Sequence, residues 1–167
     1  MQKSFWLALI ACALSAPAMA QECAGFKFDV SRELQLLSAT HESMAAASSA
    51  SALTQVVEGH VYKMTLPSQA NVQLAAQPEK LTVDEGSYAG MVAFTPAKDG
   101  NLRVSLSRAA WVDVLVDNEP LISTSHSGSQ NCKTLRKVVQ FDVKAGQPLV
   151  LQLSGATDAT VRLLVTQ

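Results

Sequence analysis

Trp111 is followed by two acidic side chains at a spacing that places all three on one face of an extended chain. Because side chains alternate between the two faces of a strand, Trp111, Asp113 and Asp117 lie opposite the valines of the same segment. An indole beside carboxylates can stack on a sugar while the acids accept hydrogen bonds from its hydroxyl groups. These three residues are therefore candidate ligand-binding residues. The alternative is that the N-terminal segment covers this face, so the exposure of Trp111 distinguishes the two interpretations.

A polar stretch at residues 123–131 is the second candidate for a binding role. It is too long for a minimal hairpin connection, and it contains His126 among serines. Because long loops on rigid β-sandwiches often bind ligands, His126 joins the candidate ligand-binding residues. The alternative is a solvated connection held in place by the cysteine that follows it.

Two cysteines lie outside the first twenty residues, Cys23 and Cys132. An even pair in an exported protein predicts a disulfide, here between the N-terminal segment and a late loop. The alternative is a reactive thiolate at Cys132, assisted by His126 and by the neighbouring Lys133. The presence of a second thiol favours the disulfide.

The sequence contains no assembled catalytic or metal-binding motif. His41, His60 and His126 are far apart and form no spacing typical of a metal site. There is no glycine-rich phosphate loop, no Gly-x-Ser-x-Gly and no Cys-x-x-Cys, and no acidic loop is dense enough for calcium. We therefore expect no catalytic residue, no cofactor and no bound metal, and a protein that is not an enzyme.

Residues 1–20 have the organisation of a cleaved signal peptide. Lys3 precedes an apolar stretch at 5–14, and Ala18-Met19-Ala20 is a small-x-small cleavage site, which predicts cleavage after Ala20. A lipoprotein acylated at Cys12 is the alternative, disfavoured because the apolar region before it is short. No later segment reaches the ~20 apolar residues needed to span a bilayer. The expected location is the periplasm or the cell exterior.

Length and charge limit the remaining function classes. Removal of residues 1–20 leaves 147 residues (167 minus 20), which is about one domain. It also removes one charged residue, Lys3, and leaves 12 basic and 14 acidic side chains, a net charge of −2. That balance gives no general attraction to phosphate backbones, so nucleic acid is not an expected partner.

The second and last thirds of the chain alternate apolar and polar side chains with the period of half-buried strands, as in Leu102, Val104 and Leu106. Because no helical stretch separates these segments, residues 55–167 predict an all-β fold, an antiparallel two-sheet β-sandwich that is jelly-roll-like. The turn at 99–101 is expected to close a hairpin between 88–95 and 102–107. The other expected strands are at about 61–66, 72–76, 81–83, 112–116, 139–143, 149–153 and 161–165.

Residues 21–54 form an N-terminal segment with a weaker pattern. Phe26, Phe28 and Val30 alternate and predict an opening edge strand. Residues 31–37 fit either a short helix beginning near Ser31 or a strand. Residues 38–54 are mostly Ala, Ser and Thr and predict a long exposed loop.

Several turn motifs recur between the strands of residues 55–167. Their succession resembles the bacterial pre-peptidase C-terminal (PPC) type of β-sandwich domain. That resemblance implies an exported accessory module without a catalytic centre, of a kind likened to carbohydrate-binding domains. The motifs that carry it are Gly59-His60-Val61-Tyr62, Gly86-Ser87-Tyr88-Ala89-Gly90, Lys98-Asp99-Gly100, Val143-Lys144-Ala145-Gly146 and Leu153-Ser154-Gly155-Ala156, before the final Val161-Arg162-Leu163.

Taken together, an export signal and a strand pattern without a catalytic motif predict a non-catalytic binding or accessory protein of the bacterial cell envelope. Its expected partner is an envelope protein or a glycan. One alternative is a small periplasmic metal- or thiol-dependent enzyme. A second alternative is a structural envelope subunit, which would self-associate or hold a permanent partner.

Overall fold

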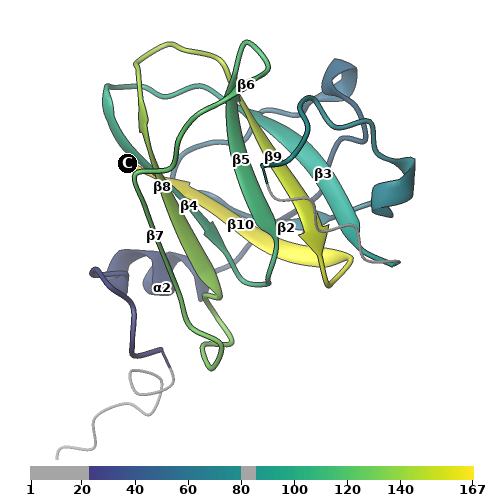
Figure 1. Cartoon of the computed structure of the whole chain (residues 1–167). Coiled ribbons are helices and arrows are strands. Elements are labelled where there is room, and N and C mark those ends of the chain that lie inside the picture. Colours follow the sequence, from purple (N-terminus) through teal and green to yellow (C-terminus); the bar gives the residue numbers. More distant parts are fainter. Residues whose placement is uncertain (1–22, 80–85) are drawn as a thin grey trace, which may run out of the picture.

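The computed structural model describes residues 23–79 and 86–167, which fold into two β-sheets packed face to face (Figure 1). The larger sheet contains, in spatial order, β1 (Glu42–Ala45), β2 (Val61–Thr65), β10 (Thr160–Thr166), β4 (Gly100–Leu106), β8 (Lys137–Val143) and β7 (Ser125–Gly128). The smaller sheet contains β3 (Tyr88–Phe94), β9 (Leu149–Ala156), β5 (Trp111–Val116) and β6 (Glu119–Pro120). The predicted all-β two-sheet sandwich is confirmed. The signal peptide, Cys12 and the strand expected at 81–83 lie outside the described residues.

The alternating side chains of the facing strands form the core between the sheets. Leu102, Val104 and Leu106 of β4 are fully buried, as are Val114 of β5 and Leu151 of β9. Burying one such side chain stabilises the folded state by about 1.5–3 kcal/mol. The apolar side chains that alternate in the sequence are therefore the ones whose burial holds the two sheets together.

The hairpin expected around residues 99–101 does not form, because β3 and β4 belong to different sheets. β3 pairs with β9, whereas β4 pairs with β8 and β10. The connection between β3 and β4 crosses from one sheet to the other and is tied to the connection between β8 and β9. Gly146 N–H donates to Pro96 O at 2.8 Å, and Ala145 N–H donates to the Asp99 carboxylate at 2.8 Å. Alternation assigns side chains to faces, but it leaves the neighbouring strand undetermined.

The loop expected at residues 38–54 is in part an edge of the sandwich. β1 pairs with β2 in parallel, an exception to the antiparallel pairing predicted for the sandwich. Beyond β1, Ala47 bridges to Met91 of β3, and both Ala46 and Ala47 are buried. This segment passes so close to β3 that only small side chains fit between them. A Cβ placed on Gly90 of β3 would lie 2.5 Å from Ala46 Cβ. The segment at 72–76 also differs from the prediction, since only an isolated bridge between Gln73 and Ser49 forms there.

The N-terminal segment covers part of the outer face of the larger sheet. The ambiguous residues 31–37 form a helix, α2 (Ser31–Leu37), while the strand expected at 26–30 is absent. Leu37 packs with Val61, Val138 and Leu164 in a second apolar cluster on this outer face. The Cys23–Cys132 disulfide closes the same cluster, with the two Cα atoms 4.5 Å apart, and confirms the predicted pairing. Such a bond indicates an oxidising environment.

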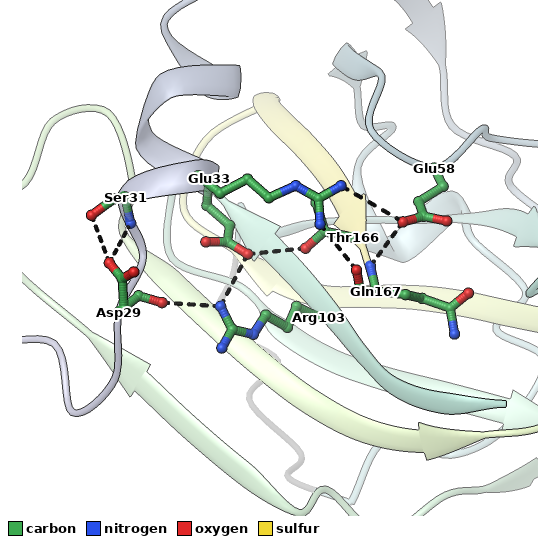
Figure 2. A network of polar contacts seen from close by, with 8 residues as sticks. Asp29, Ser31, Glu33, Glu58, Arg103, Thr166 and Gln167 are labelled. Atoms are coloured by element: carbon green, nitrogen blue, oxygen red, sulfur yellow. Dashed lines mark hydrogen bonds and ion pairs between the residues drawn. The ribbon is translucent and has the colours of Figure 1, made fainter. Parts of the chain in front are cut away.

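Polar contacts fix α2 to the strands below it, as Figure 2 shows. The Glu33 carboxylate is buried and accepts hydrogen bonds from Arg103 Nη1 of β4 at 3.2 Å and from the Thr166 hydroxyl of β10 at 3.0 Å. At the start of the helix, the Asp29 carboxylate accepts hydrogen bonds from the Ser31 hydroxyl at 2.6 Å and from the Ser31 N–H at 2.9 Å. These two hydrogen bonds from Ser31 hold the pKa of Asp29 below its usual value.

Candidate functional site

Among the residues that the structure describes, no strand pairs with the first half of β5 on the side away from β9. β6 pairs only with Leu115 and Val116, so it does not extend along Trp111–Asp113. There the start of β5 faces β7 and the start of β8 across a recess of about 430 Å³. Its walls include Trp111, His126 and Lys137. The topology therefore brings an aromatic side chain of the smaller sheet to polar side chains of the larger one.

Trp111 is partly exposed at this recess. Its side chain is therefore neither fully covered by another segment nor fully exposed to solvent. The Lys137 ammonium lies 4.9 Å from the centroid of the indole ring and donates to Ala110 O at 3.3 Å. A cation over an indole face is attracted by the ring electrons, and at partly exposed sites the contact is worth about 0.5–1 kcal/mol. The contact with Lys137 therefore helps to hold the ring at the mouth of the recess.

Asp113 is buried and accepts a hydrogen bond that holds the indole of Trp111. Trp111 Nε1–H donates to Asp113 Oδ1 at 2.8 Å, and Gln152 Nε2–H donates to Asp113 Oδ2 at 3.2 Å. Burial raises the pKa of Asp113, and these two hydrogen bonds oppose that rise. The carboxylate is thus positioned to orient Trp111, and its two oxygens are engaged within the protein.

The segment around Ala75 and Ala76 covers the face of β5 that carries Asp113. The alternative of cover by the N-terminal segment is therefore wrong in its choice of segment. Ala75 N–H and Ala76 N–H donate to Gln152 Oε1 at 2.9 Å and 3.2 Å, and Gln152 Nε2–H donates to Ala76 O at 3.0 Å. The segment around residues 75–79 therefore lies over the centre of β9 and β5. Within residues 75–79, this segment does not reach Trp111, which lines the recess.

His126 and Asp117 have different positions relative to this recess. His126 is exposed on β7, inside the stretch expected to be a loop, and it lines the recess with Trp111. Asp117 lies in the β5–β6 turn, where it has a φ of 50°, and it is exposed. The structure therefore brings Trp111, Asp113 and His126 together and leaves Asp117 outside.

A smaller cavity of about 140 Å³ extends from the recess into the sandwich. Trp111, Asp113, His126 and Lys137 line it together with core residues such as Phe141. A site with an apolar floor and a few converging polar groups is the usual form of a small-ligand site.

Three side chains of the site were not identified from the sequence: Arg136, Lys137 and Gln152. Gln152 is fully buried although it interrupts the apolar run of β9, and a polar residue within such a run is a signal that a buried polar contact exists. Lys137 is the first residue of β8 and Arg136 precedes it, and nothing in their local pattern indicates that they line the same recess as Trp111. Their role depends on the pairing of β8 with β4 and β7.

The structure tests the alternative of a reactive thiolate at Cys132. The Cys132 sulfur is bonded to Cys23, is buried, and accepts the Leu135 N–H at 3.3 Å. In this structure it is therefore not a free nucleophile. Within residues 23–79 and 86–167, no three His, Cys, Asp or Glu side chains gather as a metal site would require.

Comparison with known proteins gives no family for this chain. No protein-family model matches it, and no curated protein is similar to it. Among solved structures, it is similar to the β-glucosidase from Kluyveromyces marxianus in complex with glucose, with 13% identity and a TM-score of 0.32. That match covers 55% of this chain and 12% of the β-glucosidase.

Within the part of the chain that the structure describes, no helix has the length and apolar character needed to cross a bilayer.

Proposed function

We propose that this protein is an exported, non-catalytic β-sandwich of the bacterial cell envelope that binds a glycan in the recess beside Trp111. The observation that carries the proposal is the partly exposed indole of Trp111, fixed by the buried Asp113 carboxylate at the mouth of the recess. A rigid aromatic ring can stack on the apolar face of a sugar without losing side-chain entropy on binding.

The other walls of the recess suit a ligand rich in hydroxyl groups. Gln130 and Arg136 line it beside Lys137, and their side chains supply amide, guanidinium and ammonium groups. Each of these groups can donate a hydrogen bond to a sugar oxygen. The turn motifs that resemble PPC-type domains, which are likened to carbohydrate-binding domains, agree with this assignment.

Export and the absence of catalysis are parts of the same proposal. The predicted signal peptide and the Cys23–Cys132 disulfide support a location in the periplasm or outside the cell. A non-catalytic role is supported by a carboxylate, Asp113, whose oxygens are engaged by Trp111 and Gln152.

An envelope protein is the second candidate ligand, and one observation favours it. Ile122 is 91% exposed in the segment that follows β6, and its neighbours Leu121 and Ser123 line the smaller cavity. An exposed isoleucine at the rim of a recess can anchor a protein partner. Replacing Ile122 with serine would weaken binding to a protein partner and would leave glycan binding unchanged.

The experiment is a binding screen of the processed chain, beginning at Gln21, against envelope polysaccharides and soluble oligosaccharides. Affinity electrophoresis in gels that contain each polysaccharide detects binding, and reducing-end release over the same panel detects hydrolysis. We expect retardation by at least one glycan, its loss in Trp111→Ala, and its retention in Asp117→Asn, which alters an exposed acid outside the recess. Retardation that persists in Trp111→Ala, or reproducible release of sugar, would contradict the proposal.

A further inference from the structure

One end of the outer face of the larger sheet carries a row of basic and hydroxyl side chains. In β1 and β2, Ser43 lies beside Lys63, and in the pairing of β2 with β10, Lys63 lies opposite Arg162. On its other side, Arg162 N–H donates to Ser107 Oγ at 2.9 Å. The first half of the row therefore consists of Ser43, Lys63, Arg162 and Ser107.

The row continues across the remaining strands. Leu106 of β4 lies opposite Lys137 of β8, and Arg136 N–H donates to Leu106 O at 2.7 Å, which places Arg136 at the end of β4 where Ser107 follows. Ser129 N–H donates to Arg136 O at 3.2 Å. Three cations and three serines therefore cross the whole width of the larger sheet, and Arg108 adds a fourth cation next to Ser107.

This arrangement of charge opposes folding. Like charges directly opposite each other on paired strands are destabilising, and Lys63 and Arg162 are such a pair. Burial lowers the pKa of Arg162, and the charge of Arg108 lowers it further. A local arrangement that costs stability is expected where it serves binding.

A recess of about 460 Å³ lies over these cations, with Lys63, Arg108 and Arg162 in its walls. Of the described residues that line it, Asp158 supplies the one carboxylate, 3.8 Å from Arg108 Nε, and both side chains are about half exposed. An ion pair of that distance and exposure contributes little to stability. The recess therefore keeps a positive potential that attracts anions.

The basic recess and the Trp111 recess are neighbours. Ser107 and Arg108 line the first, while the residues that follow them directly, Ala109 to Trp111, line the second. Arg136 belongs both to the row and to the Trp111 recess. One extended ligand can therefore contact the indole and the cations together.

We propose that the ligand of the Trp111 recess is an anionic glycan, with a sugar ring at Trp111 and its oxyanion groups along Arg136, Arg108 and Lys63. This assignment rests on the proposed function and specifies its ligand class. Arg162 positions the row, because its Nη1 donates to Leu37 O at the end of α2 at 2.8 Å. Lys63 and Arg108 are more exposed, so they are the residues to substitute.

The test compares two polymers with the same sugar backbone: polygalacturonate, whose carboxylates are charged, and its fully methyl-esterified form, whose ester groups are neutral. Binding to the processed chain is measured by titration calorimetry at low and at physiological salt. The test variant is Lys63→Gln/Arg108→Gln. Its control, Lys98→Gln/Lys144→Gln, removes the same charge at the other end of the sandwich, where β4 begins opposite the end of β8. Thermal unfolding of each variant confirms that it is folded.

We expect polygalacturonate to bind more tightly than its ester, with an affinity that falls as salt rises. The test variant should lose roughly fivefold or more in affinity, and the control variant should lose less than about twofold. Equal binding of both polymers would overturn this inference and leave the proposed function standing. Binding of neither polymer would overturn the inference, and the glycan screen above would then decide the proposed function separately. Equal binding of polyglutamate would assign the row to acidic peptides instead.

Discussion

Trp111 Nε1 donates a 2.8 Å hydrogen bond to Oδ1 of Asp113, two residues further along the same strand. Asp113 is 5% exposed, whereas the indole of Trp111 lines the recess, so a buried acid orients a partly exposed side chain. The hydrogen bond between Trp111 and Asp113 therefore connects a buried residue of β5 to the candidate site. Its first consequence concerns the pH dependence of stability.

Burial raises the pKa of Asp113 above its usual value of 3.8. A carboxyl whose pKa is raised by folding contributes stability below its unfolded pKa and loses that contribution as pH rises through the folded value. Asp113→Asn cannot titrate, so the free energy of unfolding of the wild type relative to Asp113→Asn should be larger at about pH 4 than at about pH 7. Urea unfolding of both proteins at the two pH values measures this difference. A difference independent of pH, or larger at about pH 7, would contradict the assigned direction.

The buried carboxylate of Glu33 should stabilise the attachment of α2. Glu33→Ala removes the acceptor for Arg103 and Thr166 and should lower the free energy of unfolding by about 2–4 kcal/mol. Glu58→Ala is the control, because its ion pair with Arg32 is long, at 3.8 Å, and partly exposed. It also removes the acceptor of the Gln167 N–H at 3.1 Å, and it should cost about 1 kcal/mol or less. Denaturant unfolding of the two variants provides the comparison. Equal losses would show that the buried network in Figure 2 does not have the stabilising role described here.

The Cys23–Cys132 disulfide spans 109 residues. In the chain-entropy model, closing a loop of about 100 residues stabilises the folded state by up to about 4.7 kcal/mol. Reduction, or Cys23→Ser/Cys132→Ser, should therefore lower the melting temperature while the strand content remains, because the core between the sheets does not contain this bond. Thermal unfolding followed by far-ultraviolet circular dichroism measures both properties. An unchanged melting temperature would contradict the prediction.

Gly90 should be intolerant of a methyl group. A Cβ at this position would meet Ala46 Cβ, an atom that no rotamer change can move. Gly90→Ala should therefore lower the free energy of unfolding by about 1–3 kcal/mol. The double variant Gly90→Ala/Ala46→Gly removes the opposing methyl group and should recover part of the loss. Failure of the double variant to recover any stability would contradict the close packing of residues 46 and 47 on β3.

The sequence allowed the two-sheet sandwich and most of its core strands to be predicted, but the strands expected at 26–30 and 72–76 do not form, and the neighbours of each strand were not predicted. Alternation places Leu102 and Val104 in the core whichever strand lies beside them, so the sandwich is predictable from local pattern. The pairing of β4 with β8 and β10 depends on contacts between distant residues. The expected hairpin at 99–101 was wrong for that reason.

The same distinction explains the outcome for the candidate site. The period of a strand was enough to place Trp111 and Asp113 on one face, and the structure joins them by a hydrogen bond. The partners Lys137 and Gln152 come from strands 26 and 41 residues later than Trp111, and no local signal connects them to it. β1 was overlooked because its Ala- and Ser-rich sequence carries no apolar period, although its main chain pairs with β2.

The central claim is that the recess beside Trp111 binds a glycan without chemical change, and a fluorescence titration tests it most directly. Trp111 is the one tryptophan in the processed chain, so its emission reports this recess alone. Adding the oligosaccharide selected by the binding screen should shift the emission in a saturable way, and the sugar should be recovered intact. An emission that stays constant while that oligosaccharide binds, or a sugar recovered in cleaved form, would contradict the account.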